Sequence, residues 1–157
     1  MRFLLIRPLE MNPNRRIHTP SYAPSLYPPL GLEYIAASLE AAGHSVEIID
    51  CGLEPLSQDR LRRSLTIADA VGMSVYTNSY HNAKKVSELI REIDTQIPLI
   101  IGGPHCIFLQ QNALHDIPAA DIAVAGEGEQ AIVDIADYLK GKKSLAQTHG
   151  IHYRKKK

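Results

Sequence analysis

The sequence has little cysteine, no tryptophan and no long apolar run. Its two cysteines, Cys51 and Cys106, are too few for a disulfide framework, a four-cysteine zinc site or a cysteine-held iron–sulfur cluster. The apolar runs are far shorter than the roughly 20 residues that a membrane-spanning helix needs. The first residues also lack the apolar core of a signal peptide, so we expect a cytoplasmic protein with no membrane partner.

An excess of charge of one sign is also missing. Lys and Arg total 17 and Asp and Glu total 17, so the formal net charge of the 157 residues is zero. No overall field therefore attracts nucleic acid, and we expect no nucleic-acid partner. The only run of like charge, at residues 154–157, is typical of a solvated tail.

Motifs for the common nucleotide cofactors are absent as well. Arg7 and Pro8 stand where a phosphate-binding loop would need glycines followed by Lys-Ser or Lys-Thr. The one G-x-G, at residues 126–128, lacks the third glycine of a dinucleotide fingerprint. The connection over residues 8–29 is too long and too rich in proline for a flavodoxin-type phosphate loop. These absences disfavour ATP, NAD and flavin sites.

Strand and helix patterns alternate along the chain. Short apolar runs at residues 70–75 and 98–101 enclose a stretch in which apolar side chains recur at three- and four-residue steps, which predicts a βαβ unit with parallel strands. Repetition of this unit predicts an α/β fold with a doubly wound sheet. The expected strands are residues 2–7, 45–50, 70–75, 98–101, 120–125 and a short 150–154, and a helix is expected at 108–115. We predict one domain over residues 1–141, followed by a terminal strand and basic linker or tail over 142–157.

Polar and glycine-rich loops follow the two strands of the central unit. Residues 76–78 come after the first strand, and Gly102-Gly103 come after the second. Ligands of open α/β sheets bind outside the carboxyl ends of the strands. The sequence therefore predicts a binding crevice at this edge. Cys51 and Cys106 also follow strands and are expected to be reduced thiols facing the crevice.

Five fragments together resemble a known family. They are PPLGLEYIAA at 28–37, AAGH at 41–44, GMS at 72–74, IIGGPH at 100–105 and GEGE at 126–129. In order and spacing they resemble the cobalamin-binding domain that precedes the catalytic barrel in many radical S-adenosylmethionine enzymes. The resemblance covers residues 1–154. It implies a flavodoxin-like (Rossmann-like) fold of three layers with strand order 2-1-3-4-5.

The resemblance also implies a binding mode. Cobalamin would bind with its dimethylbenzimidazole tail detached from cobalt and threaded into the sheet, where Ser74 would hydrogen-bond its nitrogen. Small or polar residues would line this slot and the corrin surface: Tyr76, Thr77, Asn78, Gly102, Gly103, Pro104, His105, Gly126, Glu127 and Gly128.

One motif of the resemblance is missing. Methyl-transferring cobalamin domains carry D-x-H-x-x-G after the first strand, where the histidine coordinates cobalt, and this sequence has none. Tyr76 also stands where a leucine is usual. His18 is the only histidine in the long loop and hence the one candidate ligand, but a surface role is commoner for a loop histidine. We assign no metal-binding residue.

The resemblance implies a cobalamin-binding module, not catalytic by itself, of a radical S-adenosylmethionine methyltransferase or related enzyme. S-adenosylmethionine and a 4Fe–4S cluster would belong to a downstream barrel, supplied in cis or in trans. Two alternatives stay open. One is a non-enzymatic flavodoxin-like domain that has lost cobalamin and binds another metabolite or docks a partner domain. The other is a small stand-alone flavin or nucleotide protein.

Overall fold

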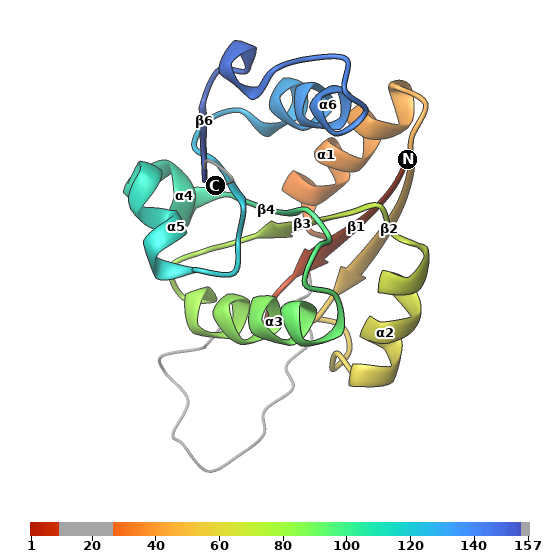
Figure 1. Ribbon diagram of the computed structural model, residues 1–157. Helices are drawn as coiled ribbons and strands as arrows, with labels where there is room; N and C mark the ends of the chain where they lie inside the picture. The colour runs from red at the N-terminus through yellow and green to blue at the C-terminus, as the bar shows by residue number, and fades with distance from the viewer. Residues whose placement is uncertain (10–26, 155–157) are drawn as a thin grey trace.

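A six-stranded sheet forms the centre of the molecule (Figure 1). The structure is a computed structural model that describes residues 1–9 and 27–154. The strand order is β2-β1-β3-β4-β5-β6; β1 to β5 are parallel, and β6 runs antiparallel to β5. The strands are β1 Arg2–Arg7, β2 Ser45–Asp50, β3 Ala70–Ser74, β4 Leu99–Gly102, β5 Ile122–Val124 and β6 Ile151–Tyr153. The expected order 2-1-3-4-5 is confirmed, with one antiparallel strand added beyond it.

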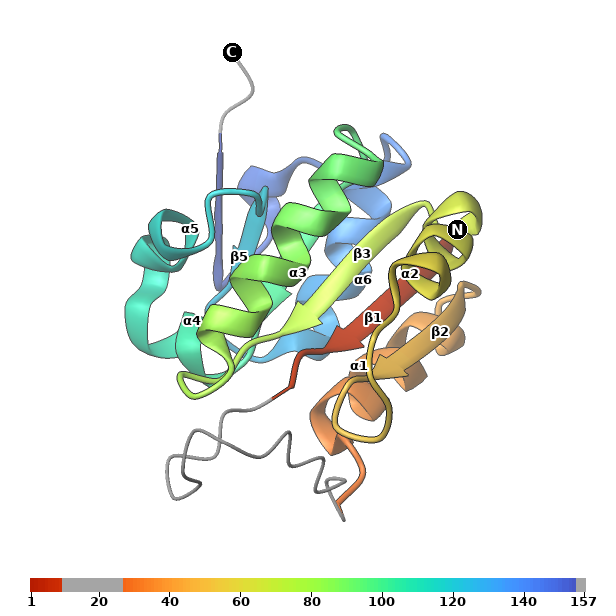
Figure 2. The same cartoon turned by 90° about the horizontal axis from the view of Figure 1, so that it is seen from below.

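Helices cover both faces of the sheet and produce the expected three layers (Figure 2). One face carries α1 and α6, and the other carries α2, α3, α4 and α5. The helices are α1 Leu30–Ala41, α2 Gln58–Ile67, α3 Tyr80–Ile93, α4 Pro104–Leu109, α5 Ala113–Asp116 and α6 Gly128–Leu139, with short 3₁₀ turns at Gln110–Asn112 and Leu145–Gln147.

Local chemistry explains several helix ends. The Ser57 hydroxyl accepts a 3.2 Å hydrogen bond from the Arg60 amide and caps the start of α2. After α1 the chain turns at Gly43 with φ +80°, a left-handed conformation that glycine adopts without a Cβ clash. Gly141 serves in the same way after α6, with φ +73°.

The helix expected at residues 108–115 is wrong in its bounds. Helix α4 instead begins at Pro104 and ends at Leu109, and the chain breaks at Gln110, where φ is +54°. Gly103, with φ +95°, turns the chain sharply out of β4, and Pro104 has a backbone suited to a first helical turn. Pro104 and His105 therefore belong to a helix and not to a loop.

The end of the described chain packs onto the same sheet. Ile151 of β6 pairs with Val124 of β5, and the Arg154 Nε donates a 3.1 Å hydrogen bond to the Ala120 carbonyl. Leu145 is buried among the residues under α1 and α6. The domain boundary after residue 141 stays a prediction, although these contacts tie residues 145–154 to the sheet.

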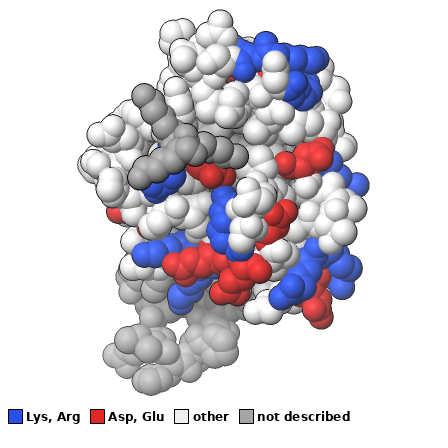
Figure 3. Space-filling view, viewed as in Figure 1, with Lys and Arg blue, Asp and Glu red and all other residues white. Residues whose placement is uncertain are grey.

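Charged side chains of both signs are interspersed on the surface (Figure 3). The longest described helix, α3, has 14 residues, and none of the described helices has the length and apolar character that a bilayer crossing requires. The charge pattern thus agrees with the balanced composition.

Candidate functional site

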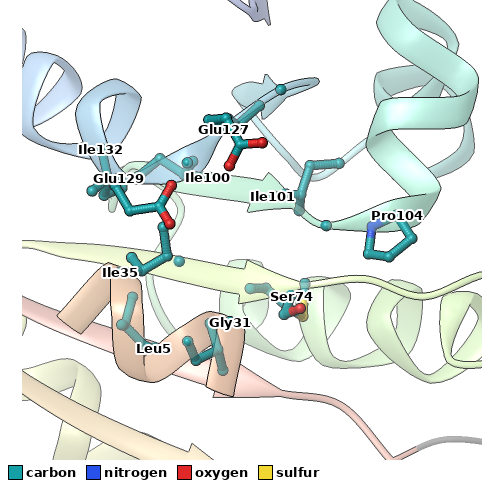
Figure 4. A pocket seen from close by; sticks show the side chains of 18 of the residues that line it. Leu5, Gly31, Ile35, Ser74, Ile100, Ile101, Pro104, Glu127, Glu129 and Ile132 are labelled. Atoms are coloured by element: carbon teal, nitrogen blue, oxygen red, sulfur yellow. The ribbon is translucent and has the colours of Figure 1, made fainter. Parts of the chain in front are cut away.

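A cavity of about 220 Å³ lies between the sheet and helices α1 and α6 (Figure 4). We call it the inner cavity. Its wall includes Leu5, Gly72 and Ile100 from the sheet, Ile35 from α1 and Ile132 from α6. This volume is smaller than the roughly 300–1,000 Å³ of sites that enclose a whole drug-sized ligand. The inner cavity is therefore suited to one ring system of a larger molecule.

Small residues at two positions of the central strands leave this space open. Ser74 of β3 pairs with Gly102 of β4, and Gly72 pairs with Ile100. Side chains alternate between the two faces of a strand, so neither Gly72 nor Gly102 puts a side chain on the α1/α6 face. Leu5 packs over Gly72, where a Cβ would lie 2.7 Å from the Leu5 Cδ2, whereas a Cβ at Gly102 would have only ordinary contacts. The sheet is thus hollowed beside the Ser74 hydroxyl.

Both the backbone conformation and the surroundings at position 103 require a glycine. Its φ is +95°, and a Cβ placed there would lie 3.0 Å from the Val75 carbonyl oxygen and 3.2 Å from the Ser74 Oγ. Any side chain at position 103 would press on the Ser74 hydroxyl and strain the backbone. The sequence prediction that Ser74 and the glycine pair lie together is confirmed in geometry.

A second space, the rim cavity, adjoins the first at the carboxyl ends of the strands. Its volume is about 370 Å³, and Arg7, Tyr27 and Pro28 contribute to its wall. Ser74 and Tyr76 line both cavities. The smaller inner cavity and the larger rim cavity therefore meet at these two residues, and we call this border the mouth.

A buried ion pair supports the rim cavity. The Arg7 Nε lies 2.9 Å from the Asp50 Oδ1, and the Arg7 Nη1 donates a 3.2 Å hydrogen bond to the Tyr27 carbonyl. The Gly52 amide donates a 2.8 Å hydrogen bond to the same carboxylate oxygen. The ends of β1 and β2 are thereby joined to the segment that leads into α1.

Most of the predicted site residues line the inner cavity. They are Ser74, Tyr76, Gly102, Gly103, Pro104, Gly126, Glu127 and Gly128. Thr77, Asn78 and His105 line neither the inner nor the rim cavity. His18 lies outside the described residues, so its role as a candidate ligand stays a prediction.

His105 faces away from the cavity because it belongs to the first turn of α4. Its ring stacks on Tyr80 at 5.2 Å between centroids, with 20° between the ring planes. The His105 Nε2 lies 3.3 Å from the Asp116 Oδ2, and the Nδ1 lies 3.5 Å from the Thr77 Oγ1. These contacts join the loop after β3 to α5, which supports the crevice from the other side of the sheet.

Sequence reasoning missed several cavity residues. They are Gly31, Ile35, Gly72, Glu129 and Ile132, none of which was selected as a site residue. Gly72 stands two residues before Ser74, and that period-two spacing is the signal that places it on the same face. Gly128 permits close helix contact, because a Cβ there would lie 2.6 Å from the Ile35 Cδ1.

The two cysteines do not face the crevice, which corrects the expectation from the sequence. Cys51 and Cys106 are free thiols buried in the core under α2 and α3. Burial raises the pKa of Cys51 to about 11 and that of Cys106 to about 12. Both thiols are therefore protonated near neutral pH and poorly nucleophilic.

Comparison with known proteins adds a family match. The family model described as the B12 binding domain matches residues 21–136. The chain is 30% identical over 129 residues to an uncharacterized methyltransferase of Pyrococcus horikoshii, covering 81% of this chain and 28% of that protein. It is 29% identical over 133 residues to the anaerobic magnesium-protoporphyrin IX monomethyl ester cyclase of Rubrivivax gelatinosus, covering 81% and 24%.

A third relative is the cytidylyl-2-hydroxyethylphosphonate methyltransferase of Streptomyces wedmorensis. It is 30% identical over 166 aligned residues, covering 93% of this chain and 31% of that protein. The chain thus spans between about a quarter and a third of the length of these three relatives.

Proposed function

Because this chain belongs to the B12-binding domain family, we propose that it holds cobalamin at the carboxyl edge of its sheet for an enzyme with further domains. Cobalamin is bound with its lower base detached from cobalt and inserted in the inner cavity. The broader rim cavity takes part of the corrin edge. When bound, cobalamin supplies a cobalt centre that can carry a methyl group.

The place and the lining of the inner cavity are the observations that carry this proposal. The opening is bordered by Gly102 and Gly103, and the Ser74 hydroxyl lies beside them. Within the described part of the chain, the Ser74 hydroxyl has no hydrogen-bond partner. It is therefore available to donate to a ring nitrogen, while the aliphatic wall contacts the faces of the ring.

The residues of this chain bind and orient the cofactor but supply no catalytic group in this proposal. Gly126 and Glu127 lie beside the mouth, where the corrin amides can meet backbone and carboxylate groups. S-adenosylmethionine and a 4Fe–4S cluster belong to a radical S-adenosylmethionine barrel in the parent enzyme. The relatives named as methyltransferases and a cyclase support a methyl-transfer or related reaction there. We also propose that the protein is cytoplasmic.

Retention of hydroxocobalamin tests the proposal. The purified protein should keep the cobalamin absorbance after gel filtration, and Ser74→Tyr or Gly102→Leu should abolish it by filling the inner cavity. Gly102→Ala is the matched control, because a Cβ at position 102 lies 3.6 Å from the Val124 Cβ, an ordinary contact. Circular dichroism checks that each variant is folded.

Other results would favour other functions. A wild-type protein that elutes colourless would contradict the proposal and favour a domain that binds another metabolite or docks a partner. A flavin spectrum after the same step would favour a stand-alone flavin protein.

A further inference from the structure

Glu129 places a carboxylate in the inner cavity. Figure 4 shows its side chain pointing from α6 into the space that Ile35 of α1 also lines. Glu129 is half-buried, and within the described residues its carboxylate makes no hydrogen bond or ion pair. The polar side chains that line the cavity are therefore Ser74 and Tyr76 at the end of β3 and Glu127 and Glu129 at the start of α6, and of the two carboxylates Glu129 is the half-buried one while Glu127 is exposed.

The backbone of Glu129 is held in place by helix packing. Gly128 lies so close to Ile35 that a Cβ there would be only 2.6 Å from the Ile35 Cδ1. Helices α1 and α6 are thus in close contact at the first turn of α6, which contains Glu129. A carboxylate in the first turn of a helix is also favoured by the helix dipole. The backbone that carries Glu129 is therefore fixed beside the cavity.

A ligand that fills the cavity removes water from this carboxylate. The neighbouring wall residues Ile35, Ile100 and Ile132 offer no hydrogen-bond donor in exchange. Removing water from a carboxylate costs binding free energy if no hydrogen-bond donor takes the place of the water. A ligand that supplies a donor avoids this cost. The cavity thus discriminates between rings by what their outer edge carries.

We infer that Glu129 selects a lower base that carries a hydrogen-bond donor, such as a purine with an exocyclic amino group, over dimethylbenzimidazole. This inference rests on the proposed function. An adenine base offers ring nitrogens to Ser74 and an amino group to Glu129. Dimethylbenzimidazole offers one free ring nitrogen and presents two methyl groups on its outer edge. Glu129 is then a specificity-determining residue of the site.

Binding of three corrinoids by the wild-type protein tests the inference. The probes are adeninylcobamide, cobalamin with dimethylbenzimidazole, and cobinamide, which has no base; equilibrium dialysis gives each Kd. The wild type should bind adeninylcobamide about tenfold more tightly than cobalamin, the effect expected for one buried acceptor left without a donor. The three probes share the corrin ring, so the ratio of their Kd values reports the contribution of the lower base alone.

Variants of Glu129 show whether this residue is the cause. Glu129→Leu should remove the preference, while Glu129→Gln should keep part of it, because its amide oxygen still accepts a hydrogen bond. Glu88→Leu is the matched control, since Glu88 is exposed on α3 across the sheet. It should leave the ratio unchanged.

The outcomes separate the two proposals. Equal affinities for the two cobamides, a preference for cobalamin, or a ratio that Glu129→Leu does not change would overturn the role of Glu129 while leaving cobalamin binding intact. If neither cobamide binds more tightly than cobinamide, the cavity takes no base, and the proposed binding mode fails as well.

Discussion

The two faces of the central sheet differ in how completely they are packed. Toward α2 and α3, strand β3 directs Val71 and Met73, and β4 directs Leu99 and Ile101, all of them buried. Toward α1 and α6, the alternate positions of the same strands are Gly72 and Ser74 on β3 and Ile100 and Gly102 on β4. One face is filled and the other is hollowed.

This difference shows how a single strand can serve two purposes. Because side chains alternate along a strand, large residues on one face can stabilise the fold while small residues on the other leave room for a ligand. We call these the closed face and the cavity face.

The largest expected effect compares Leu99 on the closed face with its neighbour Ile100 on the cavity face. Each change to alanine should lower the free energy of unfolding by about 2–5 kcal/mol. Leu99→Ala should fall in the upper half of that range, because Leu99 is fully buried among packed side chains. Ile100→Ala should fall in the lower half, because Ile100 already borders a cavity.

Urea denaturation of the two variants under identical conditions measures this difference. If Ile100→Ala lowered the free energy of unfolding as much as Leu99→Ala, the closed face would not be the better packed one.

A smaller effect is expected from adding a methyl group at Gly72. A Cβ there would lie 2.7 Å from the Leu5 Cδ2, so Gly72→Ala should destabilise the protein by about 1–3 kcal/mol through overpacking. Gly102→Ala should change stability by less than about 0.5 kcal/mol, since its new methyl has room. A double-mutant cycle with Leu5→Ala should show that the cost of Gly72→Ala depends on Leu5.

Strictly additive free energies in this cycle would mean that Leu5 is not the obstacle at position 72. The cost of a methyl group at position 72 would then have another cause.

The smallest effect concerns His44, which is buried on the cavity side of the sheet beside Phe3, with 5.5 Å between the ring centroids. Burial, and next the charge of Lys140, lower the pKa of His44 below its ordinary 6.5, while Asp137 acts in the opposite direction. The unfolded chain therefore binds this proton at a higher pH than the folded chain. Stability from neutral His44 is present above about pH 6.5 and is lost as the pH falls toward the folded-state value.

Melting temperatures of the wild type and His44→Gln between pH 7.5 and 5 measure this contribution. The wild type should lose more stability over this interval than the variant. If the melting temperatures of the wild type and the variant changed equally with pH, His44 would titrate alike in the folded and the unfolded protein.

Several features of the fold could be predicted from single segments of sequence. The bounds of β1 and β2 were predicted correctly, because each is a short apolar run with a polar or glycine-rich stop. The strand order and the neighbouring positions of Ser74 and Gly102 were also correct. The direction of His105 was not predictable in this way, because it depends on where α4 begins after the turn at Gly103.

The sequence by itself determined the alternation of strands and helices, the edge of the sheet at which the cavities lie, and the two small residues beside it, because periodicity and glycine act locally along the chain. Only the tertiary structure decided which residues wall the inner cavity. Ile35 of α1 and Glu129 of α6 are far apart in sequence and meet there because the two helices pack against the same face of the sheet. Their joint place in this wall arises from packing between distant segments, which no local pattern of residues encodes.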